Sequence, residues 1–198
     1  MPLNISEQGG GGFEPELGLH RAICTAIIDI GTQHSTYDGN EKVKRESIWQ
    51  FELVDEVVDG DEGPFHPMMS QFYTLSLSPR ANIRKALVNW RGKQFTTEEL
   101  KAFDVFKVLG LPCNLMVGLK DNGKKYIETI AGWKGEKPEA TRELWSFSFE
   151  EFDGTYPEWM TSGIKGLCEK SDEHQNFDGA FIDTAPAESV VDTDDIPF

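Results

Sequence analysis

The chain is poor in cysteine and has no long apolar run. Its three cysteines, Cys24, Cys113 and Cys168, lie far apart, form no C-x-x-C pair and have no histidine at zinc-ligand spacing. We therefore expect reduced, buried thiols and no metal site. No window approaches the roughly 18 apolar residues of a membrane-spanning helix, so no membrane association is expected. The first residues lack a basic start followed by an apolar run, which argues against a secretory signal and favours a cytoplasmic location.

Positive charge is also scarce. The 198 residues include 34 Asp and Glu against 19 Lys and Arg, a formal net charge of −15. Eight of these acids and no Lys or Arg lie in residues 171–198, so the remainder of the chain still carries −7. Nucleic-acid-binding domains are usually basic. The total charge therefore argues against such a role unless the positive side chains are gathered in patches.

No catalytic constellation is visible in the sequence. The stretch from Gly118 to Lys125 approaches a phosphate-binding loop, but Lys125 stands where a Ser or Thr must hold magnesium, and a strand-like segment follows. An acidic loop from Asp59 fails as a calcium loop, because Pro64 and Ser70 stand where glycine and glutamate are required. The four histidines are scattered, with no nucleophile beside them. We expect neither enzyme activity nor a cofactor.

Composition divides the chain into three parts. Residues 1–12 end in four glycines and are expected to form a flexible arm. Residues 13–170 carry the periodic patterns of one folded domain. Residues 171–198 are acidic and poor in large aliphatic side chains, which is typical of a disordered tail.

Strand patterns dominate the domain, because apolar and polar residues alternate in five separate stretches. These strands are predicted over residues 19–30, 47–57, 71–77, 113–119 and 124–131. The last two are joined by Asp121-Asn122-Gly123, which predicts a hairpin turn of the primed type. A further short strand is predicted around Phe147.

Two helices are predicted between the third and fourth strands. The first has Ser78 as its N-cap and ends at Gly92, and the second begins with a capping box at Thr96 and ends at Gly110. Another helix is predicted over residues 156–168. The predicted order of elements, which is three strands, then a two-helix insert, then two strands, is that of a five-stranded OB barrel. We therefore predict a mainly β, α+β fold with such a barrel, as a monomer or a dimer.

Basic residues are gathered beside aromatic ones in three places. Single-stranded DNA is held by stacking its bases on aromatic rings and by tracking its phosphates with Lys and Arg. The predicted DNA-binding residues are Lys42, Lys44, Arg45, Trp49, Tyr73, Arg84, Arg91, Lys93, Lys120, Lys124, Lys125, Tyr126, Trp133 and Lys134. Packing in the core is the alternative for each ring, and the strand pattern favours it for Trp49. Tyr126 and Trp133 lie among lysines near the expected hairpin, which favours contact with DNA.

The chain ends in carboxylates followed by an apolar tip. The predicted partner-binding residues are Asp192, Asp194, Asp195, Ile196, Pro197 and Phe198. The carboxylates suit a basic rim on a partner. Ile196 and Phe198 can fill an apolar pocket, and Pro197 restricts the backbone and so lowers the ordering cost of binding. A tail that only solubilises has no reason to end in exposed apolar side chains, so we expect the tip to bind other proteins.

The Asp-Asp-Ile-Pro-Phe ending resembles that of bacterial single-stranded-DNA-binding proteins, whose acidic tips recruit replication, recombination and repair enzymes. The body resembles, more loosely, the OB-fold single-strand binders encoded by bacteriophages. This resemblance implies a non-catalytic protein that acts in the bacterial host cytoplasm, with single-stranded DNA and replication or recombination proteins as partners. Two other functions stay open. One is an adaptor or host-takeover protein that uses the tip without binding DNA, which the acidic body favours, and the other is a metal-dependent nuclease.

Overall fold

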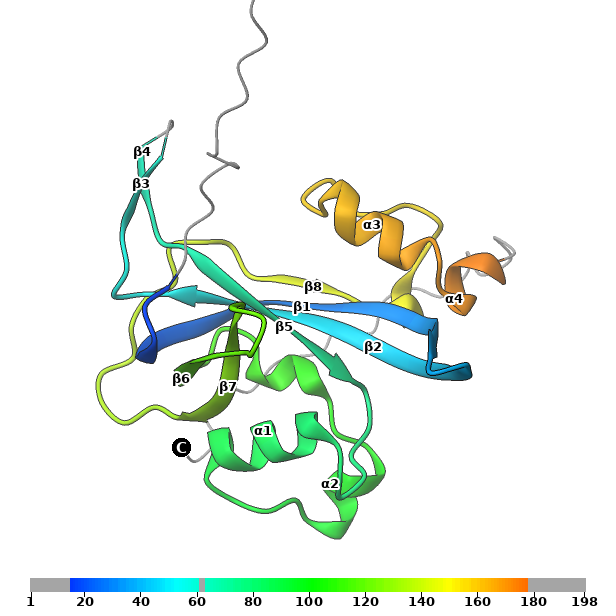
Figure 1. The fold of residues 1–198 in the computed structure, drawn as a ribbon, viewed down its shortest axis with the longest axis horizontal. Coiled ribbons are helices and arrows are strands. Elements are labelled where there is room, and N and C mark those ends of the chain that lie inside the picture. The colour runs from blue at the N-terminus through cyan, green and yellow to red at the C-terminus, as the bar shows by residue number, and fades with distance from the viewer. Residues whose placement is uncertain (1–14, 61–62, 178–198) are drawn as a thin grey trace, which may run out of the picture.

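A computed structural model describes residues 15–60 and 63–177 of the chain (Figure 1). The predicted arm over residues 1–12 lies outside these ranges, as do the tail from residue 178 onward and its tip. The strands are β1 (Gly18–Tyr37), β2 (Asn40–Leu53), β3 (Val58–Gly60), β4 (Gly63–Phe65), β5 (Met68–Thr74), β6 (Pro112–Leu119), β7 (Lys125–Gly132) and β8 (Trp145–Phe147). The helices are α1 (Asn82–Arg91), α2 (Thr97–Lys101), α3 (Ser162–Cys168) and α4 (Asp172–Gln175), with 3₁₀ turns η1 (Val105–Val108) and η2 (Phe149–Glu151).

The main sheet confirms a mainly β fold with a few helices. Five strands pair antiparallel in the order β5-β2-β1-β6-β7, and β8 adds a short parallel pairing to β1. In the described residues no hydrogen-bonded ladder joins β5 to β7, so the sheet is not closed into a barrel. The five-stranded OB-like barrel expected from the element order is therefore corrected to an open sheet. The loop predicted around Asp59 instead contains the separate β3–β4 hairpin, which projects from the body (Figure 1).

Two hairpin turns join neighbouring strands of the main sheet. Asp38 and Gly39 both have positive φ, 51° and 75°, so the turn between β1 and β2 is the primed type I′. Between β6 and β7, only Gly123 has a positive φ, 79°, and its N–H donates to the carbonyl of Lys120 at 2.9 Å. That pattern is a type I turn followed by a glycine bulge. The primed turn predicted at residues 121–123 is wrong because neither Asp121 nor Asn122 adopts a positive φ.

Two apolar clusters lie on opposite sides of the sheet. The larger cluster packs Trp49 and Phe51 of β2 against Leu87 and Trp90 of α1. The smaller cluster packs Ile28 of β1 and its neighbours against the segment from β8 to α4. Figure 1 shows α1 and α2 on one side of the sheet and α3 and α4 on the other. The half of the sheet formed by β1 and β2 is thus covered on both sides.

Local capping explains where the predicted helices differ from the observed ones. Residues 78–81 form a turn, with the Ala81 N–H donating to the carbonyl of Ser78, so α1 starts at Asn82 and not after Ser78. The capping box at Thr96 is confirmed. The second predicted helix ends early at Lys101, because the chain then extends and Asp104 caps η1. The predicted helix over 156–168 is limited to α3.

The folded part extends past the predicted domain end at residue 170. Helix α4 docks on β1, where Glu173 accepts hydrogen bonds from the Thr32 N–H at 2.6 Å and from Thr32 Oγ1 at 2.8 Å. Ser171 is fully buried beside Gly31, and a Cβ on Gly31 would lie 2.5 Å from the Ser171 Cβ. Gly31 also has φ +71°, which favours glycine. Residues 171–177 therefore belong to the fold, and the predicted tail boundary is corrected.

Candidate nucleic-acid interface

One face of the sheet is open to solvent in the described residues. Leu19 pairs with Met116 across β1 and β6, and Gly118 pairs with Tyr126 across β6 and β7. These residues alternate with the core residues of the same strands, so their side chains lie on the outer side. Leu17 and Leu19 are 56% and 65% exposed. We call this surface, formed by the outer side of β6, β7 and the start of β1, the open face.

Tyr126 lies at one end of the open face with its ring close to the sheet. A Cβ on Gly118 would lie 3.2 Å from Cε1 of Tyr126, so the glycine lets the ring approach the backbone. The Lys120 ammonium lies 5.2 Å from the ring centroid, within cation–π range. The Cε1 edge of the ring therefore lies close to β6, while the half-buried side chain still reaches solvent.

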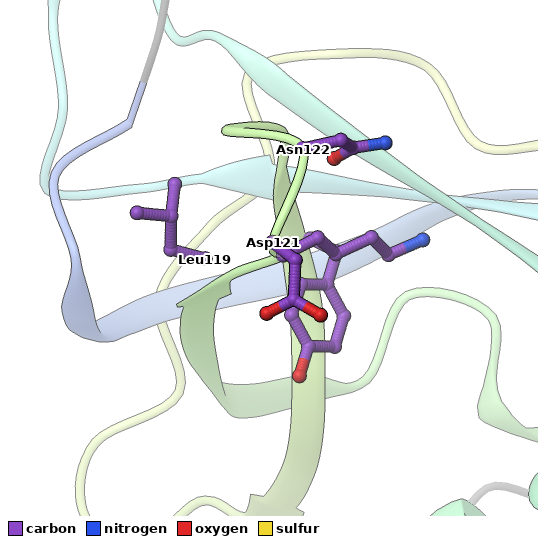
Figure 2. A pocket seen from close by; sticks show the side chains of 5 residues that line it. Leu119, Asp121 and Asn122 are labelled. Atoms are coloured by element: carbon purple, nitrogen blue, oxygen red, sulfur yellow. The ribbon is translucent and has the colours of Figure 1, made fainter.

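A shallow hollow of about 460 Å³ adjoins this ring. It is lined by Leu119, Lys120, Asp121, Asn122 and Tyr126, all from the β6–β7 hairpin (Figure 2). Lys124 is exposed on the same turn. Aromatic, apolar and cationic groups thus meet at one open site. Two carboxylates there would repel an anion: Asp121 in the hollow, and the exposed Glu128, whose Oε2 would lie 3.1 Å from a Cβ on Gly118.

Trp133 lies beyond the other end of β7 and is less available than the sequence suggested. Its indole N–H donates to the carbonyl of Glu136 at 2.9 Å, so the ring is held by its own turn. The Arg21 guanidinium lies over the ring, 5.5 Å from the centroid. Lys134 follows and is exposed. Seven positions along a strand at ~3.3 Å per residue place Trp133 on the order of 20 Å from Tyr126.

Other predicted contacts lie away from the open face. Lys42 and Lys44 are exposed on β2, near the turn of the β1–β2 hairpin. Lys93 is exposed just after α1, and half-buried Arg84 of α1 donates to the carbonyl of Leu77 at 3.0 Å. Lys125, the first residue of β7, is half-buried. The residues that the structure gathers at one site are Lys120, Lys124 and Tyr126, whereas Lys125 alternates with Tyr126 on β7 and does not line the hollow.

Two aromatic residues in the predicted set are core residues. Trp49 is 0% exposed and donates its indole N–H to Ser47, and Tyr73 is 5% exposed with its ring edge-on to Trp49 at 5.2 Å. Burial also raises the pKa of the Tyr73 hydroxyl. Neither ring has a face on which a base could stack, so the prediction that they contact DNA is wrong.

Two arginines in the predicted set are held by carboxylates. Arg45 contacts the buried Asp29 at 2.5 Å, and this hydrogen bond raises the pKa of the guanidinium. Arg91 is buried, pairs with Glu99 and lies 4.7 Å from the centroid of the Phe95 ring. Arg45 neutralises a buried acid and Arg91 joins α1 to α2. Their assignment as phosphate contacts is therefore corrected to structural roles.

Sequence reasoning missed several residues of the open face. Leu19, Arg21 and Met116 belong to it because of the pairing of β1 with β6. Alternation in residues 19–30 does indicate that Leu19 and Arg21 share a face, but it does not indicate that this face is bare. Phe72 of β5 is another missed ring, but it lies outside the open face: it is 50% exposed and pairs with Ile48, a buried residue of the smaller cluster.

Within residues 15–60 and 63–177, no group of His, Cys, Asp and Glu side chains is arranged to hold a metal ion. The three cysteines are buried and unbridged, and burial raises the pKa of Cys168 to about 12. No helix of the described ranges is long and apolar enough to cross a membrane. Comparison of the chain with protein-family models, curated proteins and solved structures finds no match.

Proposed function

We propose that the protein binds single-stranded DNA on the open face, without catalysing a reaction, and recruits replication, recombination or repair proteins through its C-terminal tip. The observation that carries the proposal is the Tyr126 ring beside Lys120 and Lys124 at an open hollow. Base stacking on such rings contributes ~1–3 kcal/mol per base, and it tolerates any sequence because every base has a π face. Lysines at the same hairpin supply the charge that follows the phosphates.

The strand order supports an OB-like arrangement that stays open between β5 and β7. Consecutive strands β1, β2 and β5 lie side by side, and the β6–β7 hairpin adds to the other edge of β1 after the helical insert. OB folds bind oligonucleotides with the loops between strands 1 and 2 and between strands 4 and 5. The second of these corresponds to the β6–β7 turn. The first corresponds to the β1–β2 turn, close to Lys42 and Lys44.

The acidic total does not prevent binding if the local charge at the contact is positive. Lys120, Lys124 and Lys134 are all exposed along β7 and its two ends. The logarithm of the binding constant should then fall with the logarithm of the salt concentration, with a slope near −0.7 per phosphate contacted. A steep slope would indicate that Lys42 and Lys44 also contact the strand.

The tip lies outside the described residues, so recruitment is proposed from its sequence. The tip combines carboxylates with apolar side chains, in Asp192, Asp194, Asp195, Ile196, Pro197 and Phe198. The acidic tail can also compete with DNA for the lysines. Deleting residues 190–198 is therefore expected to tighten DNA binding and to abolish recruitment, and unchanged DNA affinity in the deletion would contradict the competition.

The test of the proposed function is a titration of the full chain with oligo-dT and with a matched duplex, followed by gel shift and by protein fluorescence. We expect binding to the single strand and weaker binding to the duplex. Absence of a shift with both would contradict the proposal and favour the adaptor function that the acidic body suggests. Magnesium-dependent degradation of the labelled strand would contradict it in favour of a nuclease.

A further inference from the structure

Arg21 is the arginine of the open face. It lies on β1 opposite Asn114 of β6, and its side chain is 51% exposed. Its Nε donates to Asp55 Oδ2 and its Nη2 donates to Asp55 Oδ1, so one carboxylate fills the planar fork of the guanidinium. Such a fork matches any anion that offers two oxygens at the spacing of a carboxylate or a phosphate.

The guanidinium is held in place from two sides. Trp133 lies against it at 5.5 Å and is itself fixed by the hydrogen bond to Glu136. Asp55 follows β2, and the Val54 N–H donates to the Arg21 carbonyl at 3.1 Å, which keeps the two chain segments together. The Trp133 contact does not depend on Asp55, so the guanidinium keeps this support when an anion replaces the carboxylate, which lowers the ordering cost of binding.

The ion pair that fills the fork is exposed and replaceable. Its two side chains are 51% and 37% exposed, and pairs at such exposure add little to stability because water and salt compete for both partners. A buried pair would resist exchange, as Arg45 and Asp29 illustrate, with Asp29 only 4% exposed. Asp55 can thus leave Arg21 without disturbing either apolar cluster, since neither cluster contains these residues.

We propose that Arg21 binds a backbone phosphodiester of the single strand, and that Asp55 occupies its fork until the strand arrives. This inference rests on the proposed DNA-binding function. The lysines around Trp133 in the sequence favoured stacking of a base on its ring. In this proposal the ring instead holds Arg21 in place and does not stack on a base. The strand would then run along β7, from Tyr126 at the hairpin to Arg21 near the other end.

The test compares Asp55→Asn, Arg21→Gln and the double variant of the full chain in titrations with oligo-dT at low salt. Asp55→Asn keeps the side-chain shape and removes the competing charge, so we expect an affinity gain of about 2- to 5-fold. Arg21→Gln should lower the affinity and make the salt slope shallower by about 0.7. The double variant should behave as Arg21→Gln, because the gain needs the arginine.

Glu98→Gln is the matched control, because it removes an exposed negative charge on α2, which lies on the side of the sheet opposite the open face (Figure 1). It should leave the affinity unchanged, which separates the local effect from the change in net charge. If the wild-type chain binds oligo-dT and Asp55→Asn does not bind more tightly, the pair is only a link between β1 and the segment after β2, and this inference is wrong while the proposed function stands. If the wild-type chain does not bind, both are wrong.

Discussion

Replacing Tyr126 by Ala should weaken binding of single-stranded DNA without unfolding the protein. Stacking contributes ~1–3 kcal/mol per base. The Tyr126 ring lies close to β6 at Gly118 and the Lys120 ammonium lies over it, so at most one base can stack on it, and we expect a loss in the lower part of that range. A tenfold change in affinity corresponds to about 1.4 kcal/mol, so the expected loss is roughly 5- to 30-fold. Fluorescence titration with oligo-dT at fixed salt measures it.

Two further variants make this prediction specific. Tyr126→Phe keeps the ring and should bind within about twofold of the wild type, because stacking does not need the hydroxyl. Phe65→Ala removes a ring that is 40% exposed on the β3–β4 hairpin, and it should leave the affinity unchanged. Melting temperatures should stay close to that of the wild type, since Tyr126 belongs to neither apolar cluster. Equal affinities of Tyr126→Ala and the wild type would show that no base stacks on this ring.

Three other predictions concern stability. Glu52 is fully buried and accepts hydrogen bonds from the Thr141 N–H, Thr141 Oγ1 and the Arg142 N–H. Glu52→Ala should therefore lower the free energy of unfolding, measured by urea denaturation, by about 2–4 kcal/mol. Trp49→Phe should lower the melting temperature without changing the oligo-dT affinity of the folded protein, because Trp49 packs in the core. Hydrogen bonds to Glu41 and Asp172 raise the pKa of His34 above its ordinary value of 6.5. The stability that protonated His34 adds to the folded protein should therefore be fully present below pH 6.5 and should be lost as the pH rises through the raised pKa. An NMR titration of the His34 ring should show a pKa above 6.5 in the wild type and a lower pKa in Asp172→Asn.

Much of the sheet is predictable from local patterns. Alternation locates the inward side chains of β2 and β6, such as Phe51 and Leu115, because a strand buries every second residue. The capping box at Thr96 is equally local, since its two hydrogen bonds join residues three apart. The length of the second helix is not predictable in the same way, because it depends on a competing cap at Asp104.

The candidate site depends on longer-range facts. Whether an outward side chain is exposed is decided by which half of the sheet the segment from β8 to α4 covers, and alternation carries no information about that. The sequence gives no sign that Arg45 is paired, because its partner Asp29 lies on the neighbouring strand β1. Arg21 gains its position on the open face from the pairing of β1 with β6, far apart in the sequence. Local patterns therefore identify Tyr126 and the lysines of its hairpin, whereas the partners of the arginines emerge only from the fold.

The central claim is that a single strand lies on the open face, and photo-crosslinking tests it most directly. An oligonucleotide that carries 5-iododeoxyuridine is bound to the full chain and irradiated, and the attached peptide is identified by mass spectrometry. We expect attachment within residues 113–134, at Tyr126. Attachment confined to the segment from β8 to α4, or to the β3–β4 hairpin, would contradict it.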